Sequence, residues 1–541
     1  MIFKSAVTDV PVLEKLIHDV FNGSALGHAD KVALIDSETG VEVTYKQLHD
    51  QSQSVASYLY QHGFSKGDFV CIIMHNCLEI LPIFLGVVMQ GGVLSLVRYA
   101  YGDYELTYQL KDSQPKFVFC QQTNFEKVRN AVQELPEMPT IVVIANTDSE
   151  AYPSGTTPFK EVLACPPDSS RPKVNVDFSK DAVVAIYSSG TTGLPKGVLF
   201  SHSNLMTHLA ITRAFIETHM FTNAKHLLSA FSGIGLLFMP MYHVVGFITA
   251  LANVLKGSTV VIMHFYDFEK LCFNIEKYKL GNLKVNSPIL IQFTDSPIVE
   301  KYDLSSLKVL LTGGAAVPKS VCESAKRRLP SVEFIGQGYG LTETVGVTHG
   351  SVFKKDSPIQ TSVQLAPNTE MKNVDSTGKE LGFHERGEIW LRSKALTIGY
   401  LNKPEFTAQS IDPEGWYHTG DIGYVDTNGE LYIVDRINEM IKFGSTSIFP
   451  AEIEDFLMTH PKIGDVAIVG VPHEVYGEVP MAFVVKKNER LKGDDVHEYM
   501  KSHMATYKQL IGGVRFVESI PRNVTGKIMR RMLKENAKKE I

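Results

Sequence analysis

Short apolar runs alternate with helical segments along most of the chain, and this alternation restricts the fold more than any other feature. Strand-like runs occur at residues 68–74, 116–120, 140–144 and 182–187, and a helical pattern covers residues 45–62. Strands that alternate with helices form mostly parallel sheets whose two faces are both covered. The sequence therefore predicts an α/β fold.

The pattern changes near Val425. The stretch VDTNGELYIVDR places Asn428-Gly429 between two β-prone runs, which is a strong signal for a β-hairpin. A compact tail of about a hundred residues follows, which is a plausible size for a small domain. We expect two domains, residues 1–437 and residues 438–541.

Composition excludes several classes of function. The 541 residues, 44% of them hydrophobic, suffice for more than one core. A net charge of −6 argues against nucleic acid as the main partner. The six cysteines form no C-x-x-C pair, so we expect neither a metal cluster nor a disulfide framework, and a reducing compartment.

The first residues of the sequence lack the continuous apolar region of a secretory signal, and a membrane span is the less favoured alternative for the longest apolar run. The longest apolar run, residues 78–97, is interrupted by Glu79, Pro82 and the Gly91-Gly92 pair, so it predicts a buried helix and a turn. The last residues, KKEI, differ from the S-K-L type of peroxisomal signal. We expect a cytoplasmic location, with the peroxisome left open, and the oligomeric state is not predicted.

The stretch YSSGTTGLPKGVLFSH, residues 187–202, is a candidate anion-binding loop. Glycines and hydroxyls expose donors to an anion, and Lys196 adds a charge, so a polyphosphate is the expected ligand. A flexible linker is the alternative. Pro195 precedes Lys196 and Gly197 follows it, so the loop lacks the hydroxyl that holds magnesium in a Walker P-loop.

This loop resembles the signature loop of the adenylate-forming superfamily, which includes acyl-CoA synthetases, 4-coumarate-CoA ligases and firefly-luciferase-like enzymes. Four further motifs follow in the order of that family: GQGYGLTET at 336–344, WYHTGD at 416–421, VDRINEMIK at 434–442 and PRNVTGK at 521–527. The resemblance implies a large N-terminal domain of α/β subdomains plus a β-barrel-like part, with a small mobile C-terminal α+β domain. It also implies activation of a carboxylic acid by ATP, followed by transfer of the acyl group to coenzyme A.

The resemblance assigns the phosphate, metal and adenine sites. The phosphate loop would use Ser188, Ser189, Gly190, Thr191, Thr192, Gly193 and Lys196. Thr342 would bind the α-phosphate, and Glu343 would hold Mg²⁺, a hard cation that prefers oxygen ligands. Tyr339 would stack on adenine, against the backbone of the turn Gly314, Ala315 and Ala316. Gln337, Gly338 and Gly340 would also bind the nucleotide, and Gly338 and Gly340 together with residues 345–347 would line the wall and floor of the acyl pocket.

The ribose, the reacting carboxylate and the second step are assigned in the same way. Asp421, assisted by Arg436, would accept hydrogen bonds from the ribose hydroxyls, although an isolated Asp in TGD is more often a cap. Lys527 would bridge the carboxylate and the phosphate, and His243 would lie beside the carboxylate. The alternatives are a solvated lysine and an ordinary half-buried histidine. Asn438 falls at the hinge position, and Lys442 would face the site in the second step.

Departures from the family pattern concern the second step. In IKFGSTSIFP, Gly444 replaces a lysine and Ser445 a glycine in a hairpin that contacts coenzyme A in coumarate ligases, and His264 also replaces a lysine. Val97, Arg98 and Ser393 stand where the family has Pro, Asn and Gly. The leading hypothesis is an acyl-CoA synthetase that acts on a fatty or aromatic acid. The alternatives are an adenylating enzyme with another acceptor (a carrier-protein thiol, an amine or oxygen) and a non-catalytic homologue that binds acyl or nucleotide ligands.

Overall fold

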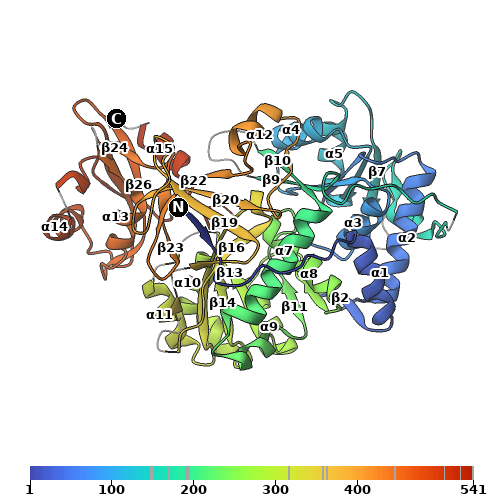
Figure 1. The fold of residues 1–541 in the computed structure, drawn as a ribbon, viewed down its shortest axis with the longest axis horizontal. Coiled ribbons are helices and arrows are strands. Elements are labelled where there is room, and N and C mark those ends of the chain that lie inside the picture. The colour runs from blue at the N-terminus through green and yellow to red at the C-terminus, as the bar shows by residue number, and fades with distance from the viewer. Residues whose placement is uncertain are drawn as a thin grey trace.

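The computed structural model describes residues 1–145, 152–168, 170–188, 195–314, 317, 319–355, 359–360, 363–443, 446–504, 506–523 and 526–538. Four sheets organise these residues (Figure 1). Three of them form the large N-terminal part, and the fourth forms a separate C-terminal part at the left of the view.

An eight-stranded sheet follows the predicted α/β pattern. Its parallel centre consists of β4 (Phe69–Ile73), β5 (Val93–Val97), β6 (Phe117–Gln121), β7 (Thr140–Ile144) and β9 (Ala182–Ser188). The two-residue strand β8 (Thr157–Pro158) extends one edge, and β10 (Lys196–Ser201) and β21 (Gly399–Tyr400) extend the other. The predicted strands are confirmed to within one residue at each end.

Helices cover both faces of this sheet, because alternate strand residues point to opposite sides. Helices α2 (Tyr45–Gln61) and α3 (Ile80–Met89) pack in one core cluster, together with Val70 and Ile72 of β4. Helices α4 (Asp103–Ser113) and α5 (Phe125–Val132) pack in another, against Cys71 and Ile73. The apolar run at 78–97 is therefore a buried helix and a turn, as expected, and its last five residues form β5.

An eleven-stranded mixed sheet forms the centre of the molecule. Its parallel end consists of β13 (Asn282–Val285), β14 (Val309–Thr312) and β15 (Phe334–Leu341), with β17 (Ile359–Gln360) also paired to β15. The antiparallel part continues through β16 (Gly346–Gly350), β18 (Val363–Leu365), β23 (Glu430–Arg436), β22 (Tyr417–Val425), β20 (Gly387–Ser393), β19 (Thr369–Val374) and β1 (Ile2–Lys4). This part corresponds to the expected barrel-like region, although among the described strands the pairing order does not close.

The third sheet of the N-terminal part is small. It consists of β11 (Gly235–Leu237), β12 (Val260–Ile262), β2 (Val32–Asp36) and β3 (Glu42–Thr44). The remaining helices of the N-terminal part are α1 (Ile17–Gly27), α6 (Phe159–Ala164), α7 (His202–Phe215), α8 (Val244–Leu255), α9 (Phe268–Tyr278), α10 (Ser287–Asp295), α11 (Lys319–Arg328) and α12 (Pro404–Ser410).

The C-terminal part has its own sheet and its own two cores. Strands β25 (Thr446–Ile448), β24 (Ile441–Phe443), β27 (Gly477–Lys486), β26 (Ile463–His473) and β28 (Val514–Phe516) form it. Helices α13 (Pro450–Leu457) and α14 (Gly493–His503) contribute to one core, and α15 (Arg530–Lys538) to the other. The expected class, a large α/β domain with a small α+β domain, is confirmed, whereas the boundary at 437/438 stays a prediction.

Several local expectations have clear outcomes. The Asn428-Gly429 pair connects β22 to β23, and Gly429 has a φ of +77°, as a tight hairpin turn requires. All six cysteines are free and buried. Ser393 ends β20 without a positive φ, and its hydroxyl donates to the carbonyl of Asn368 at 2.8 Å.

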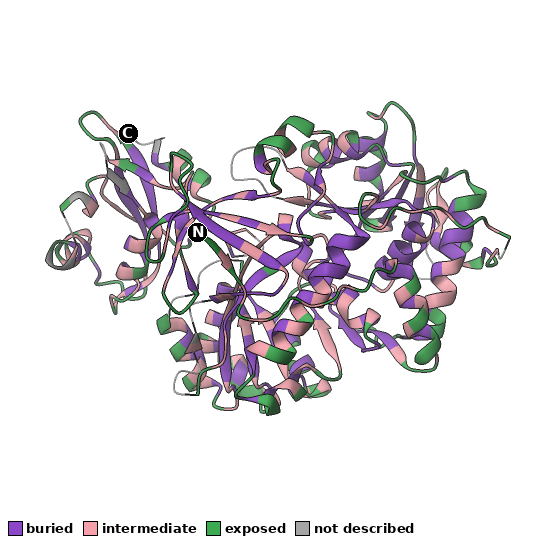
Figure 2. Cartoon of the chain, in the orientation of Figure 1, coloured by how far each residue is buried: buried purple, intermediate pink, exposed green. Residues whose placement is uncertain are grey.

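None of the described helices is long and apolar enough to cross a membrane. Figure 2 shows that buried residues fill the strands and the inner faces of the helices.

Candidate functional site

A cavity of about 530 Å³ lies between the N-terminal sheets and the C-terminal part. Residues from both parts line it, and many of the residues that the motifs predicted are among them. These are Ser188, Lys196, His243, Gly314, Gln337, Gly338, Gly340, Thr342, Glu343, Arg436, Asn438 and Lys527. The structure therefore brings five motifs, spread over more than three hundred residues of sequence, around one space.

Asp421 and Arg436 face each other across neighbouring strands. They are directly opposed in the antiparallel pair β22 and β23, and Arg436 Nε lies 2.8 Å from Asp421 Oδ1. The hydroxyl of Tyr339 donates to Asp421 Oδ2 at 2.7 Å. Burial raises the pKa of Asp421, and Arg436 and Tyr339 oppose that rise. The contact from Tyr339 was not predicted, because it depends on how β15 packs on β22.

Glu343 lies on the short 3-10 turn Thr342–Thr344 that follows β15. Its Oε1 accepts a hydrogen bond from the hydroxyl of Tyr400 at 3.0 Å. Burial raises the pKa of Glu343, and burial lowers the pKa of Lys196. Lys196 Nζ lies 3.3 Å from the centre of the Phe406 ring. The half-buried carboxylate of Glu343 and the half-buried ammonium group of Lys196 thus lie at the same end of the cavity.

The backbone after Glu343 is strained. Val345 has a φ of 62°, in the left-handed region that a β-branched residue rarely adopts. Its amide donates to the carbonyl of Thr342 at 2.9 Å, and its side chain is fully buried in the main core. Packing therefore holds a conformation that costs about 1–3 kcal/mol, as is common at binding sites.

The donor set around Glu343 fits a magnesium ion shared with a phosphate. Among the described residues no three His, Cys, Asp or Glu side chains are grouped to form a metal cage. Mg²⁺ is usually bound by only one or two carboxylates, with substrate phosphates and water completing its shell. A single half-buried carboxylate, with Lys196 at the same end of the cavity, matches that arrangement.

Lys527 reaches the cavity from the C-terminal part. Its Nζ lies 3.1 Å from Glu439 Oε1, and Arg530 Nε lies 3.0 Å from the other oxygen of the same carboxylate. Burial lowers the pKa of Lys527, and nearby Arg436 lowers it further. Burial acts to raise the pKa of Glu439, but Lys527 and Arg530 hold it below its ordinary value. Glu439 was not predicted from the sequence.

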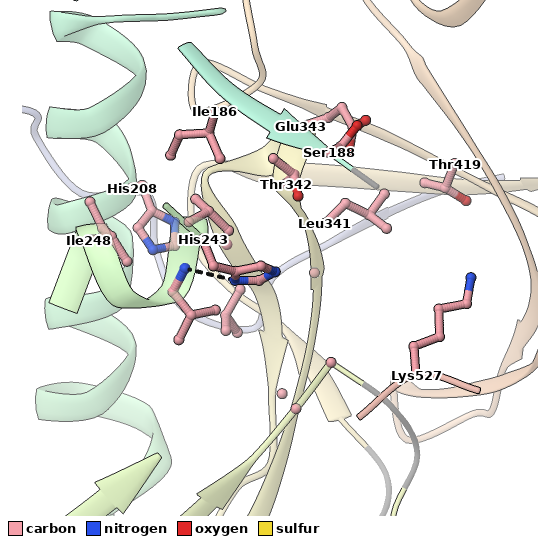
Figure 3. Close-up of a pocket in the computed structure, with 18 of the residues that line it drawn as sticks. Ile186, Ser188, His208, His243, Ile248, Leu341, Thr342, Glu343, Thr419 and Lys527 are labelled. Atoms are coloured by element: carbon pink, nitrogen blue, oxygen red, sulfur yellow. Dashed lines mark hydrogen bonds between the residues drawn. The ribbon is translucent and has the colours of Figure 1, made fainter. Parts of the chain in front are cut away.

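His243 precedes helix α8 and lines the cavity away from Lys527 (Figure 3). The amide of Val245 donates to its Nδ1 at 3.5 Å, which leaves Nε2 to carry the proton. Burial lowers the pKa of His243 to about 4, so the ring is neutral at physiological pH. It can donate a hydrogen bond but carries no charge.

The part of the cavity beyond His243 is mostly apolar. Its walls come from α7, α8 and the β15–β16 pair, and include Ile211, Phe215, Val245, Ile248 and Val347. At Gly340 a Cβ atom would lie 1.9 Å from the carbonyl oxygen of Gly346, so only glycine allows these strands to approach so closely. The same region contains His208 and Lys284, which sequence reasoning missed because no motif marks them.

Lys442 lies outside this cavity. It is exposed on β24, and its backbone amide donates to Glu478 Oε2 at 3.0 Å. His264, at one of the departures from the family pattern, pairs with Asp36 at 2.6 Å, and this hydrogen bond raises its pKa. The other predicted residues lie outside the described residues, namely Ser189, Gly190, Thr191, Thr192, Gly193, Ala315, Ala316, Gly444 and Ser445.

Comparisons with known proteins agree with this arrangement. The family described as AMP-binding enzyme matches residues 21–401, and the AMP-binding enzyme C-terminal domain matches residues 452–527. The 4-coumarate-CoA ligase 3 of Arabidopsis thaliana is 36% identical over 98% of this chain and 93% of its own length. A probable 4-coumarate-CoA ligase 2 of Dictyostelium discoideum is 33% identical over 98% and 97% of the two chains.

Two solved structures illustrate the fold. The fatty acyl CoA synthetase of Mycobacterium tuberculosis superposes with a TM-score of 0.71 at 27% identity, covering 96% of this chain and 98% of the other. The anthranilate CoA ligase AuaEII, in complex with anthranoyl-AMP, gives 0.85 at 22% identity and covers 98% of both chains. At that identity the second likeness shows the fold alone.

Proposed function

The chain belongs to the AMP-binding enzyme family, and from this premise we propose that its cavity activates a carboxylic acid with ATP and then transfers the acyl group to coenzyme A. The relatives confirm the expected enzyme class, an acid–thiol ligase of the acyl-CoA synthetase type. The observation that carries the proposal is that Lys196, Glu343, the Asp421–Arg436 pair and Lys527 surround a space that continues into an apolar chamber.

In the first step an oxygen of the acid attacks the α-phosphorus of ATP. The bond from that phosphorus to the bridging oxygen breaks, and its electron pair leaves with pyrophosphate. The substrate itself supplies the nucleophile, so the protein has to position two anions and neutralise the developing charge. Lys527 draws the carboxylate towards the phosphate, and Lys196 neutralises the departing pyrophosphate.

The nucleotide is held at its ribose and its phosphates. Asp421 accepts from the ribose hydroxyls with the lone pairs that Tyr339 and Arg436 leave available, because a carboxylate has about four acceptor positions. Thr342 donates to the α-phosphate. Glu343 would hold Mg²⁺, which when bound offsets phosphate charge. Neutral His243 donates a hydrogen bond to the carboxylate of the acid, and because the ring is uncharged, Lys527 remains the cation that pairs with that carboxylate.

In the second step the sulfur of the thiol attacks the acyl carbon and the bond to AMP breaks. The thiol proton is released to water. Lys442 serves this step after the C-terminal part has rotated about Asn438, since in the present arrangement Lys442 is remote from the cavity.

Release of pyrophosphate from ATP tests the proposal. The assay uses a panel of fatty and aromatic acids with Mg²⁺, with and without coenzyme A. We expect turnover only when both acid and coenzyme A are present. A single burst of pyrophosphate that coenzyme A does not extend would instead favour a different acceptor. His264 stands where coumarate ligases have a lysine that contacts coenzyme A, and its pairing with Asp36 is consistent with that outcome. No release with any acid would contradict the proposal. The cytoplasmic location stays a prediction.

A further inference from the structure

A lysine in the apolar chamber is not used by the proposed reaction. On strand β13 the side chains of Leu283 and Val285 belong to a buried core. Lys284, between them, faces the opposite side of the sheet and lines the cavity. Alternation along a strand explains this placement. From the sequence alone, Lys284 would be expected on the solvent-exposed face of a strand.

Lys284 lies at the end of the cavity opposite Lys527. Its Nζ donates to Thr249 Oγ1 on α8 at 3.3 Å, and its charge acts on His208 of α7. In Figure 3 His208 and Ile248, the neighbour of Thr249, lie on one side of the pocket and Lys527 on the other. The two lysines therefore mark two ends of one space, with His243 between them.

The ammonium group of Lys284 has no carboxylate to balance it among the residues that the structure describes. Its one hydrogen bond there goes to a neutral hydroxyl. The charged group that acts on it is another cation, Lys256, and burial together with Lys256 lowers the pKa of Lys284 to about 8. The group is thus still largely protonated at pH 7, although a buried and unbalanced charge is unfavourable.

We propose that the acid activated by this enzyme carries a second carboxylate at its far end, which pairs with Lys284. This inference rests on the proposed function, since it assigns the substrate class of the same site. The carbon chain between the two carboxylates lies along the apolar wall formed by residues such as Phe215, Val245 and Ile248. The reacting carboxylate faces Lys527, and the second one supplies the negative charge that the protein does not.

The experiment compares straight-chain dicarboxylic acids of increasing length with monocarboxylic acids of the same length. Pyrophosphate release gives kcat/KM for each acid with the wild-type protein, Lys284→Met and Lys256→Met. Methionine keeps the length of the side chain and removes the charge. Lys256→Met is the matched control, because it removes a neighbouring cation that does not line the cavity.

We expect the wild type to prefer at least one dicarboxylic acid over its monocarboxylic partner by about tenfold or more. Lys284→Met should lose that preference, whereas Lys256→Met should keep it. A melting temperature of Lys284→Met at or above that of the wild type would show that the lysine does not serve stability.

Other outcomes separate the two proposals. A wild type that prefers the monocarboxylic acid at every length, or a preference that survives in Lys284→Met, would overturn the inference and leave the proposed function intact. No pyrophosphate release with either series or with any aromatic acid would contradict the proposed function itself. Preference for a para-hydroxylated aromatic acid over every dicarboxylic acid would also overturn the inference, because a phenol is neutral at pH 7.

Discussion

Burial shifts the pKa of several titratable side chains that line the cavity. It lowers the pKa of Lys284 to about 8 and that of His243 to about 4, so at neutral pH the first is a cation and the second is not. Lys256 at the end of α8 also lowers the pKa of Lys284, and Lys284 in turn helps to lower the pKa of His208 on α7 to about 3, so His208 is neutral.

A pH dependence follows for the Lys284 cation. Because its pKa is lowered, the charge is present below about pH 8 and is lost above it. The kcat/KM for a dicarboxylic acid, divided by that for the monocarboxylic acid of equal length, should fall as the pH rises through about 8. Titration of a group that affects both acids equally, such as Lys527, cancels in this ratio. In Lys284→Met it should be flat, and a fall of equal size in that variant would contradict the assignment.

The contact of Tyr339 with Asp421 gives a second prediction. Tyr339→Phe keeps the ring that would stack on adenine and removes the hydroxyl that donates to Asp421 at 2.7 Å. Loss of a hydrogen bond to a charged group costs about 1.5–3 kcal/mol, so KM for ATP should rise about tenfold or more while KM for the acid changes little. Steady-state kinetics in both substrates provide the check. Tyr424→Phe, whose ring stacks on Tyr432 away from the cavity, is the control, and an unchanged KM for ATP in Tyr339→Phe would remove this role.

The sequence motifs predicted some of the residues of the site and missed others. Asp421, Arg436 and Lys527 stand in recognisable local patterns, and the structure does bring them together. Glu439 and Lys284 carry no such pattern, since their significance comes from neighbours distant in sequence. Only the packing of β13 against α8, and of the turn after β23 against the C-terminal part, reveals them.

Arg530, the first residue of helix α15, pairs with two carboxylates of the C-terminal part. Arg530 donates to both oxygens of Glu454 at 2.7 and 2.9 Å and pairs with Glu439 at 3.0 Å, and its side chain is 10% exposed. The next residue, Arg531, makes an exposed pair with Glu535 one helical turn away. Neighbouring arginines on the same helix thus have very different surroundings.

Their substitution should have correspondingly different effects. Arg530→Met leaves the buried Glu454 without a cationic partner among the described residues and removes one of the two cations at Glu439, so we expect the full-length protein to lose about 3–5 kcal/mol of unfolding free energy. Arg531→Met should change it by no more than about 1 kcal/mol, because an exposed pair contributes little. Urea titration of both variants gives the comparison, and equal losses would show that burial is not what distinguishes them.

Among the elements, the parallel strands could be predicted and the mixed sheet could not. β4, β6, β7 and β9 are short apolar runs buried on both faces, so composition alone marks them. The mixed sheet pairs β1 with β19 and β18 with β23, which lie far apart in the chain. Such pairing depends on which surfaces meet during folding, and no local pattern encodes it.

For the molecule as a whole, the two motif lysines of the C-terminal part lie at different places. Lys527 lines the cavity and contacts Glu439, whereas Lys442 is exposed on β24 and does not reach the cavity. The present arrangement is therefore suited to the first step, and the second would require the C-terminal part to turn.

This separation predicts opposite losses in two variants. Lys527→Ala removes a cation from the reacting carboxylate and phosphate, so formation of the acyl-adenylate should fall by about 10²–10³-fold while thioester formation from a pre-made acyl-adenylate is spared. Lys442→Ala should retain the pyrophosphate burst of the first step and lose thioester formation. Single-turnover assays of each step, with the acyl-adenylate supplied directly for the second, measure both. If both variants lost both steps equally, the proposed rotation of the C-terminal part would be wrong, and one fixed site would have to use both lysines together. In the present arrangement Lys442 is exposed on β24 and does not line the cavity, so it could not take part in such a fixed site.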